Sequence, residues 1–135
     1  MLASFKCNTM DYKNYYILPA PPEEVYKALT FEPTIRLWTG ADVSMPNEIG
    51  AEFSMWDGQI VGRIVALEEG KKIVQEWYFG DLPDPSLVTL KLHQHKKGTS
   101  LELNHTNIPD VDYDDIVEGW NDIYFDALYE FYEED

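Results

Sequence analysis

The sequence predicts an α+β domain in which an antiparallel sheet of about six strands packs on one long C-terminal helix, with two short helices after the first strand. Three features predict this fold. Residues 51–106 alternate apolar and polar side chains between turn sequences, as hairpin strands do. Prolines at residues 19–33 mark the starts of short helices. Residues 113–131 repeat apolar side chains at helical spacing. A chain of 135 residues is expected to form a single domain, 1–135.

The first part of the chain predicts one strand and two short helices. Residues 1–13 have little pattern and are expected to be a leading segment, flexible or at a sheet edge. The β-prone run 15–18 ends at prolines. The Pro-Pro-Glu-Glu sequence that follows favours a helix start, because proline fits the first turn and acids complement the helix dipole. Pro33 opens a second helical piece, 34–38, which ends at Gly40.

The middle of the chain predicts five more strands joined by turns into a meander. Asp57-Gly58 is a strong hairpin signal, and Lys96–Gly98 marks another hairpin. Pro83–Pro85 predicts a loop after the fourth strand that could close the mouth of a cavity. The expected strands are 51–55, 59–67, 72–79, 86–95 and 99–106.

Strand parity separates an inward apolar face from an outward polar one, so one face of the sheet can pack on the terminal helix. The polar residues Gln75, Gln94, His105 and Asn107 share the inward parity, and buried polar groups need hydrogen-bond partners. The inward apolar set is Phe53, Met55, Ile60, Ile64, Ile73, Trp77, Phe79, Val88, Leu90, Leu92, Leu101 and Leu103.

The formal net charge of −15 is concentrated in the last segment, since residues 110–135 hold eleven acids and no Lys or Arg. Acidic charge disfavours phosphate-backbone binding and adsorption to anionic membranes, so no nucleic-acid or membrane partner is expected. No apolar run is long enough to span a bilayer, and residues 1–13 are too polar for a signal peptide. These features predict a cytoplasmic protein.

The same acidic segment predicts an amphipathic helix, whose outer face has two interpretations. It is a solvated surface, or it is a docking surface for a basic partner. The expected buried face of this helix consists of Tyr113, Ile116, Val117, Trp120, Ile123, Tyr124, Ala127, Leu128 and Phe131. The acids at residues 133–135 oppose the helix dipole, so that end is expected to fray.

Catalytic and metal-binding signals are weak. His93 and His95 share one strand face, but His105 lies on the other, so the histidines do not converge on a metal and no cofactor is expected. Cys7 is a single cysteine without an activating environment. His105 points inward, where it is either a core histidine with one partner or a general base or ligand anchor.

Six short motifs occur along the chain in the order 21–29, 37–40, 56–58, 73–77, 108–109, and 118–120 with Tyr124. Together they resemble the activator of heat-shock-protein-90 ATPase homologues, within the helix-grip START and birch-pollen-allergen superfamily. The resemblance implies a curved sheet gripping the terminal helix, with an internal apolar cavity in many members. It covers about residues 14–132.

The resemblance implies a non-enzymatic binding protein that holds a small apolar ligand between sheet and helix. One alternative is a co-chaperone domain that contacts a chaperone and regulates its ATPase in a stress response. Another is a cyclase- or hydrolase-like enzyme with His105 as base. A filled core remains the competing interpretation of the cavity. The candidate cavity residues are Trp38, Phe53, Met55, Gln75, Trp77, Leu90, Leu103, His105, Trp120 and Tyr124.

Overall fold

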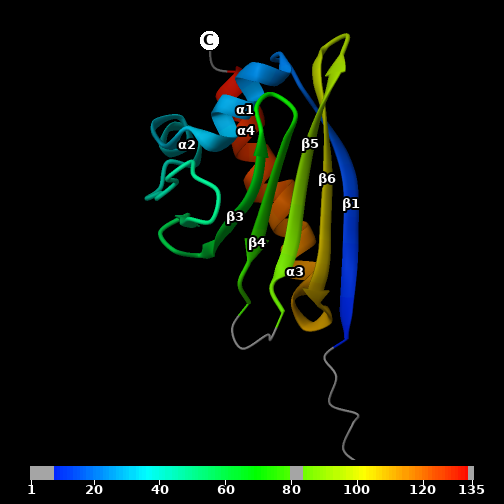
Figure 1. Cartoon of the computed structure of the whole chain (residues 1–135). Coiled ribbons are helices and arrows are strands. Elements are labelled where there is room, and N and C mark those ends of the chain that lie inside the picture. Colours follow the sequence, from blue (N-terminus) through cyan, green and yellow to red (C-terminus); the bar gives the residue numbers. More distant parts are fainter. Residues whose placement is uncertain (1–7, 80–83, 134–135) are drawn as a thin grey trace, which may run out of the picture.

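The computed structural model describes residues 8–79 and 84–133, which form a six-stranded antiparallel sheet and a long, segmented C-terminal helix (Figure 1). The strands are β1 (Thr9–Leu18), β2 (Glu52–Met55), β3 (Ile60–Glu68), β4 (Lys72–Trp77), β5 (Ser86–His95) and β6 (Gly98–Pro109). The helices are α1 (Pro22–Thr30), α2 (Glu32–Thr39), the 3₁₀ turn Asp110–Asp112, α3 (Tyr113–Gly119), the π-helical segment Trp120–Tyr124 and α4 (Phe125–Glu133). The predicted fold class is confirmed.

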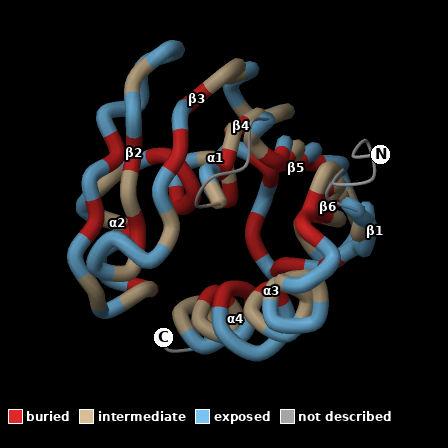
Figure 2. The backbone as a smooth tube through the Cα atoms, turned by 90° about the horizontal axis from the view of Figure 1, so that it is seen from below, coloured by how far each residue is buried: buried red, intermediate tan, exposed pale blue. Residues whose placement is uncertain are grey.

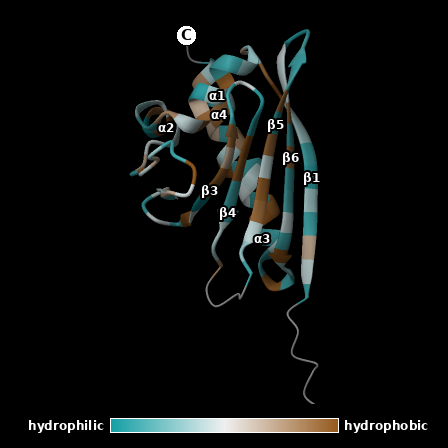
Figure 3. Ribbon diagram, viewed as in Figure 1, coloured by the Kyte–Doolittle hydropathy of each residue, from teal (hydrophilic) through white to brown (hydrophobic). Residues whose placement is uncertain are grey.

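The sheet is a meander with the N-terminal strand added beside the last one. Its order is β1-β6-β5-β4-β3-β2, and all neighbours are antiparallel. Figure 2, seen along the strands, shows the sheet as an arc whose concave side faces α3 and α4. Hydrophobic and hydrophilic residues alternate along β5 in Figure 3, as expected of a sheet with one buried face.

The first strand is longer than the sequence predicted. β1 begins at Thr9, so part of the expected leading segment is paired with β6 along the edge of the sheet. Most of β1 is exposed on both faces, and an exposed edge strand needs no apolar alternation. Helix α2 likewise begins at Glu32, two residues before the predicted start.

The terminal helix contains a π turn that the periodicity did not predict. A π turn inserts one extra residue into an α-helix, so it changes which side chains face the sheet. Phe125 is fully buried, although it was not assigned to the buried face, and Ile123 is 54% exposed, so its predicted inward position is wrong. Trp120, Tyr124 and Leu128 are buried as predicted.

Two of the four inward polar assignments are also wrong. Gln94 is exposed, because it lies at the end of the β5–β6 hairpin beyond the helix. Asn107 has a left-handed φ of 61°, opposite a shift in the β1–β6 register. Its side-chain amide donates to the carbonyl oxygens of Asp84 and Pro85 at 3.1 and 3.3 Å. Gln75 and His105 are buried as predicted.

Some sequence predictions fall outside the described residues: the environment of Cys7, the part of the proposed mouth-closing loop around Pro83, and the fraying of the last two acids. Among the helices of the described residues, none is sufficiently long and apolar to cross a bilayer. Within the same residues, no three His, Cys, Asp or Glu side chains gather in a way that would hold a metal ion.

Gly62 on β3 is required by a close approach between strands, which yields a stability prediction. A methyl group there would overlap the carbonyl oxygen of Glu76 on β4, whereas one at Gly119 in α3 meets nothing within 4 Å. We expect Gly62→Ala to lower the free energy of unfolding by about 1–3 kcal/mol, as overpacking does. The matched Gly119→Ala should raise it by about 0.5–1 kcal/mol, because alanine favours a helix. Urea unfolding of both variants tests this, and equal effects would contradict the packing of β3 on β4.

Candidate functional site

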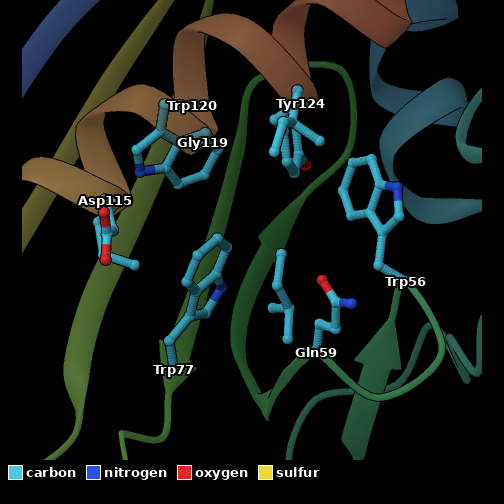
Figure 4. A pocket seen from close by; sticks show the side chains of 10 residues that line it. Trp56, Gln59, Trp77, Asp115, Gly119, Trp120 and Tyr124 are labelled. Carbon is cyan, nitrogen blue, oxygen red and sulfur yellow. The ribbon is translucent and has the colours of Figure 1, made fainter. Parts of the chain in front are cut away.

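A pocket of about 160 Å³ lies between the concave face of the sheet and the terminal helix (Figure 4). The β2–β3 hairpin and β4 form one side, and α3 with the π turn forms the other. Most of its lining is apolar, with one carboxylate and one side-chain amide among the lining groups. The lining residues are Trp56, Gln59, Ile60, Trp77, Asp115, Ile116, Gly119, Trp120, Ile123 and Tyr124.

Four aromatic side chains form a continuous wall of this pocket. Trp77 on β4 stacks on Trp120 of the π turn, with ring centroids 4.9 Å apart and planes 21° apart. The ring centroids of Trp120 and Tyr124 are 4.6 Å apart, and those of Tyr124 and Trp56 are 5.6 Å apart. Residues four apart lie on the same side of a helix, so Trp120 and Tyr124 both face the sheet. The π turn adds Phe125, five residues after Trp120, to that side.

Trp56 reaches the pocket from a strained hairpin turn. Trp56 and Asp57 both have positive φ, 52° and 58°, and Gly58 N–H donates to the Met55 carbonyl at 3.2 Å. A turn with two such residues normally carries Asn or Gly, so a tryptophan here costs backbone energy. The hairpin that the sequence predicted from Asp57-Gly58 is confirmed, with these two residues at the centre of its loop. The sequence did not identify Trp56 as a pocket residue.

The stacked tryptophans each donate their indole N–H to a buried polar group. The Trp77 Nε1–H donates to Gln75 Oε1 at 3.0 Å, and the Trp120 Nε1–H donates to His105 Nδ1 at 3.0 Å. This explains two polar side chains on the inward face of the sheet, since each accepts a bond that a buried indole would otherwise lack. Because Nδ1 accepts, the neutral His105 ring carries its proton on Nε2, which has no partner among the described residues.

His105 does not line the pocket. It is fully buried, and the centroid of its ring lies 5.1 Å from that of Trp77 and 5.8 Å from that of Trp120. Burial lowers the pKa of His105 from 6.5 to about 3, so the ring is neutral near pH 7. A general base must lie within hydrogen-bond reach of the proton it takes. Sealed behind two indoles, His105 does not have that access, so the arrangement does not support the enzymatic alternative.

The structure divides the ten predicted cavity residues into three groups. Trp77, Trp120 and Tyr124 line the pocket together. Trp38 lines a separate groove between α2 and α4, and its indole N–H donates to the Ala28 carbonyl at 2.7 Å. The other six are buried core residues that do not line the pocket, namely Phe53, Met55, Gln75, Leu90, Leu103 and His105.

The polar side of the pocket was not predicted from the sequence. Asp115 was grouped with the acids of the outer helix face, and Gln59 was placed at the start of a strand without a role. Gly119 is also a pocket residue, and its helical backbone angles, φ −61° and ψ −41°, do not require glycine. A glycine within a helix where neither φ nor packing demands it is the signal that could have identified this side.

Comparison with known proteins agrees with this architecture. Residues 19–133 match the family model described as activator of Hsp90 ATPase homolog 1-like protein. The chain belongs to this family. The human activator of 90 kDa heat shock protein ATPase homolog 1 is 28% identical over 109 residues, 79% of this chain and 32% of that protein. A Dictyostelium discoideum activator homologue is 31% identical over 102 residues, 73% of this chain and 27% of that protein. The chain thus spans about a third or less of these relatives.

Solved structures of similar proteins share the fold. A crystal structure of an HSP90 activator from Plasmodium falciparum is 25% identical, with a TM-score of 0.76, and covers 91% of this chain and 94% of that one. A protein from Chromobacterium violaceum is also 25% identical, with a TM-score of 0.74 and coverage of 93% and 98%. The Aha1 dimer from Colwellia psychrerythraea, 18% identical with a TM-score of 0.74 and coverage of 92% and 94%, shows the same fold.

Burial of His105 predicts a specific dependence of stability on pH. The unfolded chain takes up this proton near pH 6.5, whereas the folded protein does so only near pH 3. The free energy of unfolding therefore falls as the pH drops below 6.5, with a slope from this group approaching about 1.4 kcal/mol per pH unit. His105→Gln retains an acceptor for Trp120 and removes this component.

Urea unfolding between pH 7 and pH 4 measures the slope. We expect a flatter profile for His105→Gln than for the unsubstituted protein. The control His95→Gln, in the β5–β6 hairpin, should keep the original slope. A profile for His105→Gln as steep as that of His95→Gln would contradict the buried, neutral state of His105.

Proposed function

We propose that this family member is a non-enzymatic binding domain whose aromatic pocket holds an apolar group the size of one ring or a short branched alkyl chain. The observation that carries the proposal is the 160 Å³ pocket walled by four aromatic side chains. An apolar cavity of about 150 Å³ in another protein holds benzene, so the volume is enough for such a group. Pockets of this kind, apolar with a few polar groups, are typical of ligand sites.

The packing around the pocket supports a small group rather than a lipid-sized one. Tyr16 of β1 stacks on Phe125 with ring centroids 3.7 Å apart, and Phe125 packs on Trp120 with ring centroids 5.7 Å apart. These rings fill the layer between the sheet and the terminal helix. The proposed ligand site therefore lies beside the core, at the β2–β3 side, rather than inside it.

Two strained or costly features at the pocket also support a binding role. The left-handed Trp56 costs about 1–3 kcal/mol, and Gly119 costs about 0.5–1 kcal/mol relative to alanine in a helix. At Gly119, packing does not require glycine, because a Cβ there meets nothing within 4 Å. Trp56 packs on Trp38 and Tyr124 and also adds an aromatic wall to the pocket. Gly119 leaves space in the pocket, so a ligand would explain its cost.

Gly119→Leu tests this function by filling the pocket. The new side chain has open space within 4 Å of its Cβ, so the fold should be retained. With benzene as the probe, we expect saturable shifts of the pocket tryptophans' indole N–H NMR signals in the unsubstituted protein and at least about tenfold weaker binding in the variant, the loss of about 1.4 kcal/mol.

The matched control is Glu118→Leu, which adds the same side chain on the exposed helix face next to the pocket. It should bind benzene as the unsubstituted protein does. Absence of any saturable shift with benzene or with small branched alcohols would remove the proposed function. Equal binding by the Gly119→Leu and Glu118→Leu variants would show that the probe binds elsewhere.

A second candidate function is contact with a heat-shock-protein-90 chaperone that regulates its ATPase. The observation that favours it is the family match, together with relatives that are named activators of this ATPase. In this role the protein would work in the cytoplasm, the location expected from its sequence. Because the chain spans about a third of the human relative, its contact need not reproduce that protein's whole activity.

Chaperone regulation is tested by the steady-state ATPase rate of a heat-shock-protein-90 homologue with increasing amounts of this protein. If the second function holds, the rate rises and then saturates, and stimulation weakens with salt because the domain is strongly acidic. A rate that stays constant at large stoichiometric excess would count against this function while leaving the pocket proposal intact.

A further inference from the structure

We propose that the group held in the pocket carries a positive charge, so that the site binds a compact organic cation such as a methylated ammonium. This inference rests on the proposed binding function and names the chemical class of its ligand. Two independent features of the pocket carry it: the aromatic side chains that wall it, and the sign of the charge at its edge.

The aromatic wall favours a cation over a neutral group. Ring faces carry negative potential, and a cation within about 6 Å of a ring centroid is attracted to them. Trp56, Trp77, Trp120 and Tyr124 come from the β2–β3 hairpin, β4 and the helix, so they surround the pocket from several sides (Figure 4). The positive indole N–H groups of Trp77 and Trp120 are already bonded to Gln75 and His105.

The charge at the edge of the pocket also favours a cation. Among the described lining residues, Asp115 is the only ionisable one besides Tyr124, and burial raises the pKa of Tyr124, which therefore stays neutral. In residues 8–79 and 84–133, no salt bridge engages the Asp115 carboxylate. The helix around it contributes further acids and no base, since residues 110–135 contain no Lys or Arg. An anionic ligand would be repelled here, and a cation would be attracted.

Size selects a compact cation with apolar substituents. A trimethylammonium group presents methyl groups to the rings and spreads its charge over them, so it is cheap to desolvate compared with a bare ammonium ion. Choline carries this group, and 3,3-dimethylbutan-1-ol has the same shape without the charge. The pair therefore separates the charge of the ligand from its apolar surface.

The test is a titration of the ¹⁵N-labelled full chain with choline and with 3,3-dimethylbutan-1-ol at low ionic strength, read on the four indole N–H signals. We expect choline to bind between about threefold and thirtyfold tighter than the neutral alcohol. The signals of Trp56, Trp77 and Trp120 should shift, while that of Trp38, which packs on Trp56 and Tyr124 but does not line the pocket, should shift less.

Asp115→Asn should weaken choline binding by about two- to fivefold and leave the alcohol unaffected. The matched control Asp114→Asn removes the same charge from the neighbouring exposed position, outside the pocket lining, and should change choline binding less. A peptide bearing trimethyllysine, titrated in parallel, identifies the source. Tighter binding of the peptide assigns a protein side chain, and tighter binding of choline assigns a free small cation.

Equal or tighter binding of the neutral alcohol would overturn the cation inference, as would equal effects of Asp115→Asn and Asp114→Asn. In that case saturable binding of benzene or of the alcohol would still support the proposed function. If neither these probes nor choline bound, the proposed function would be wrong, and the cation inference, which rests on it, would be wrong as well.

Discussion

The stacking of Trp77 on Trp120 sets the distance between the sheet and the terminal helix, and the surrounding structure depends on it. Each indole buries roughly 150–250 Å² and also needs a partner for its N–H. Gln75 and His105 provide those partners from the inward face of the sheet. The contact is therefore both apolar and directional, and it fixes the rotation of the helix as well as its distance.

The π turn and the pocket both lie next to this contact. In a regular α-helix, residues five apart lie about 140° apart around the axis, so Trp120 and Phe125 could not both face the sheet. The extra residue of the π turn lets Phe125 pack under Tyr16 while Tyr124 remains beside Trp120. The pocket occupies the space left at the edge of this packing, where Gly119 adds no side chain.

Sequence reasoning predicted the fold because alternation on the strands and helical spacing at the end of the chain are local signals. It also predicted that Trp77, Trp120 and Tyr124 share one region, and they line one pocket. It missed Phe125 and Trp56, because a π turn and a left-handed tryptophan break the periods on which such predictions rest. Asp115 follows an exposed pattern and becomes a pocket residue only through the position of β4 across from it. One of the acids that make up the charge of −15 thus lies at a candidate site rather than only on a solvated face.

The coupling energy between Trp120 and His105 tests most directly whether their hydrogen bond holds the helix on the sheet. A double-mutant cycle with Trp120→Phe and His105→Phe, read by urea unfolding at pH 7, compares the single losses with the combined loss. Each single change leaves a buried polar group without its partner and should cost about 1–3 kcal/mol, while the double change leaves neither group unpaired. We expect the double variant to lose clearly less than the sum of the single variants. Strictly additive losses would show that this hydrogen bond does not hold the helix on the sheet.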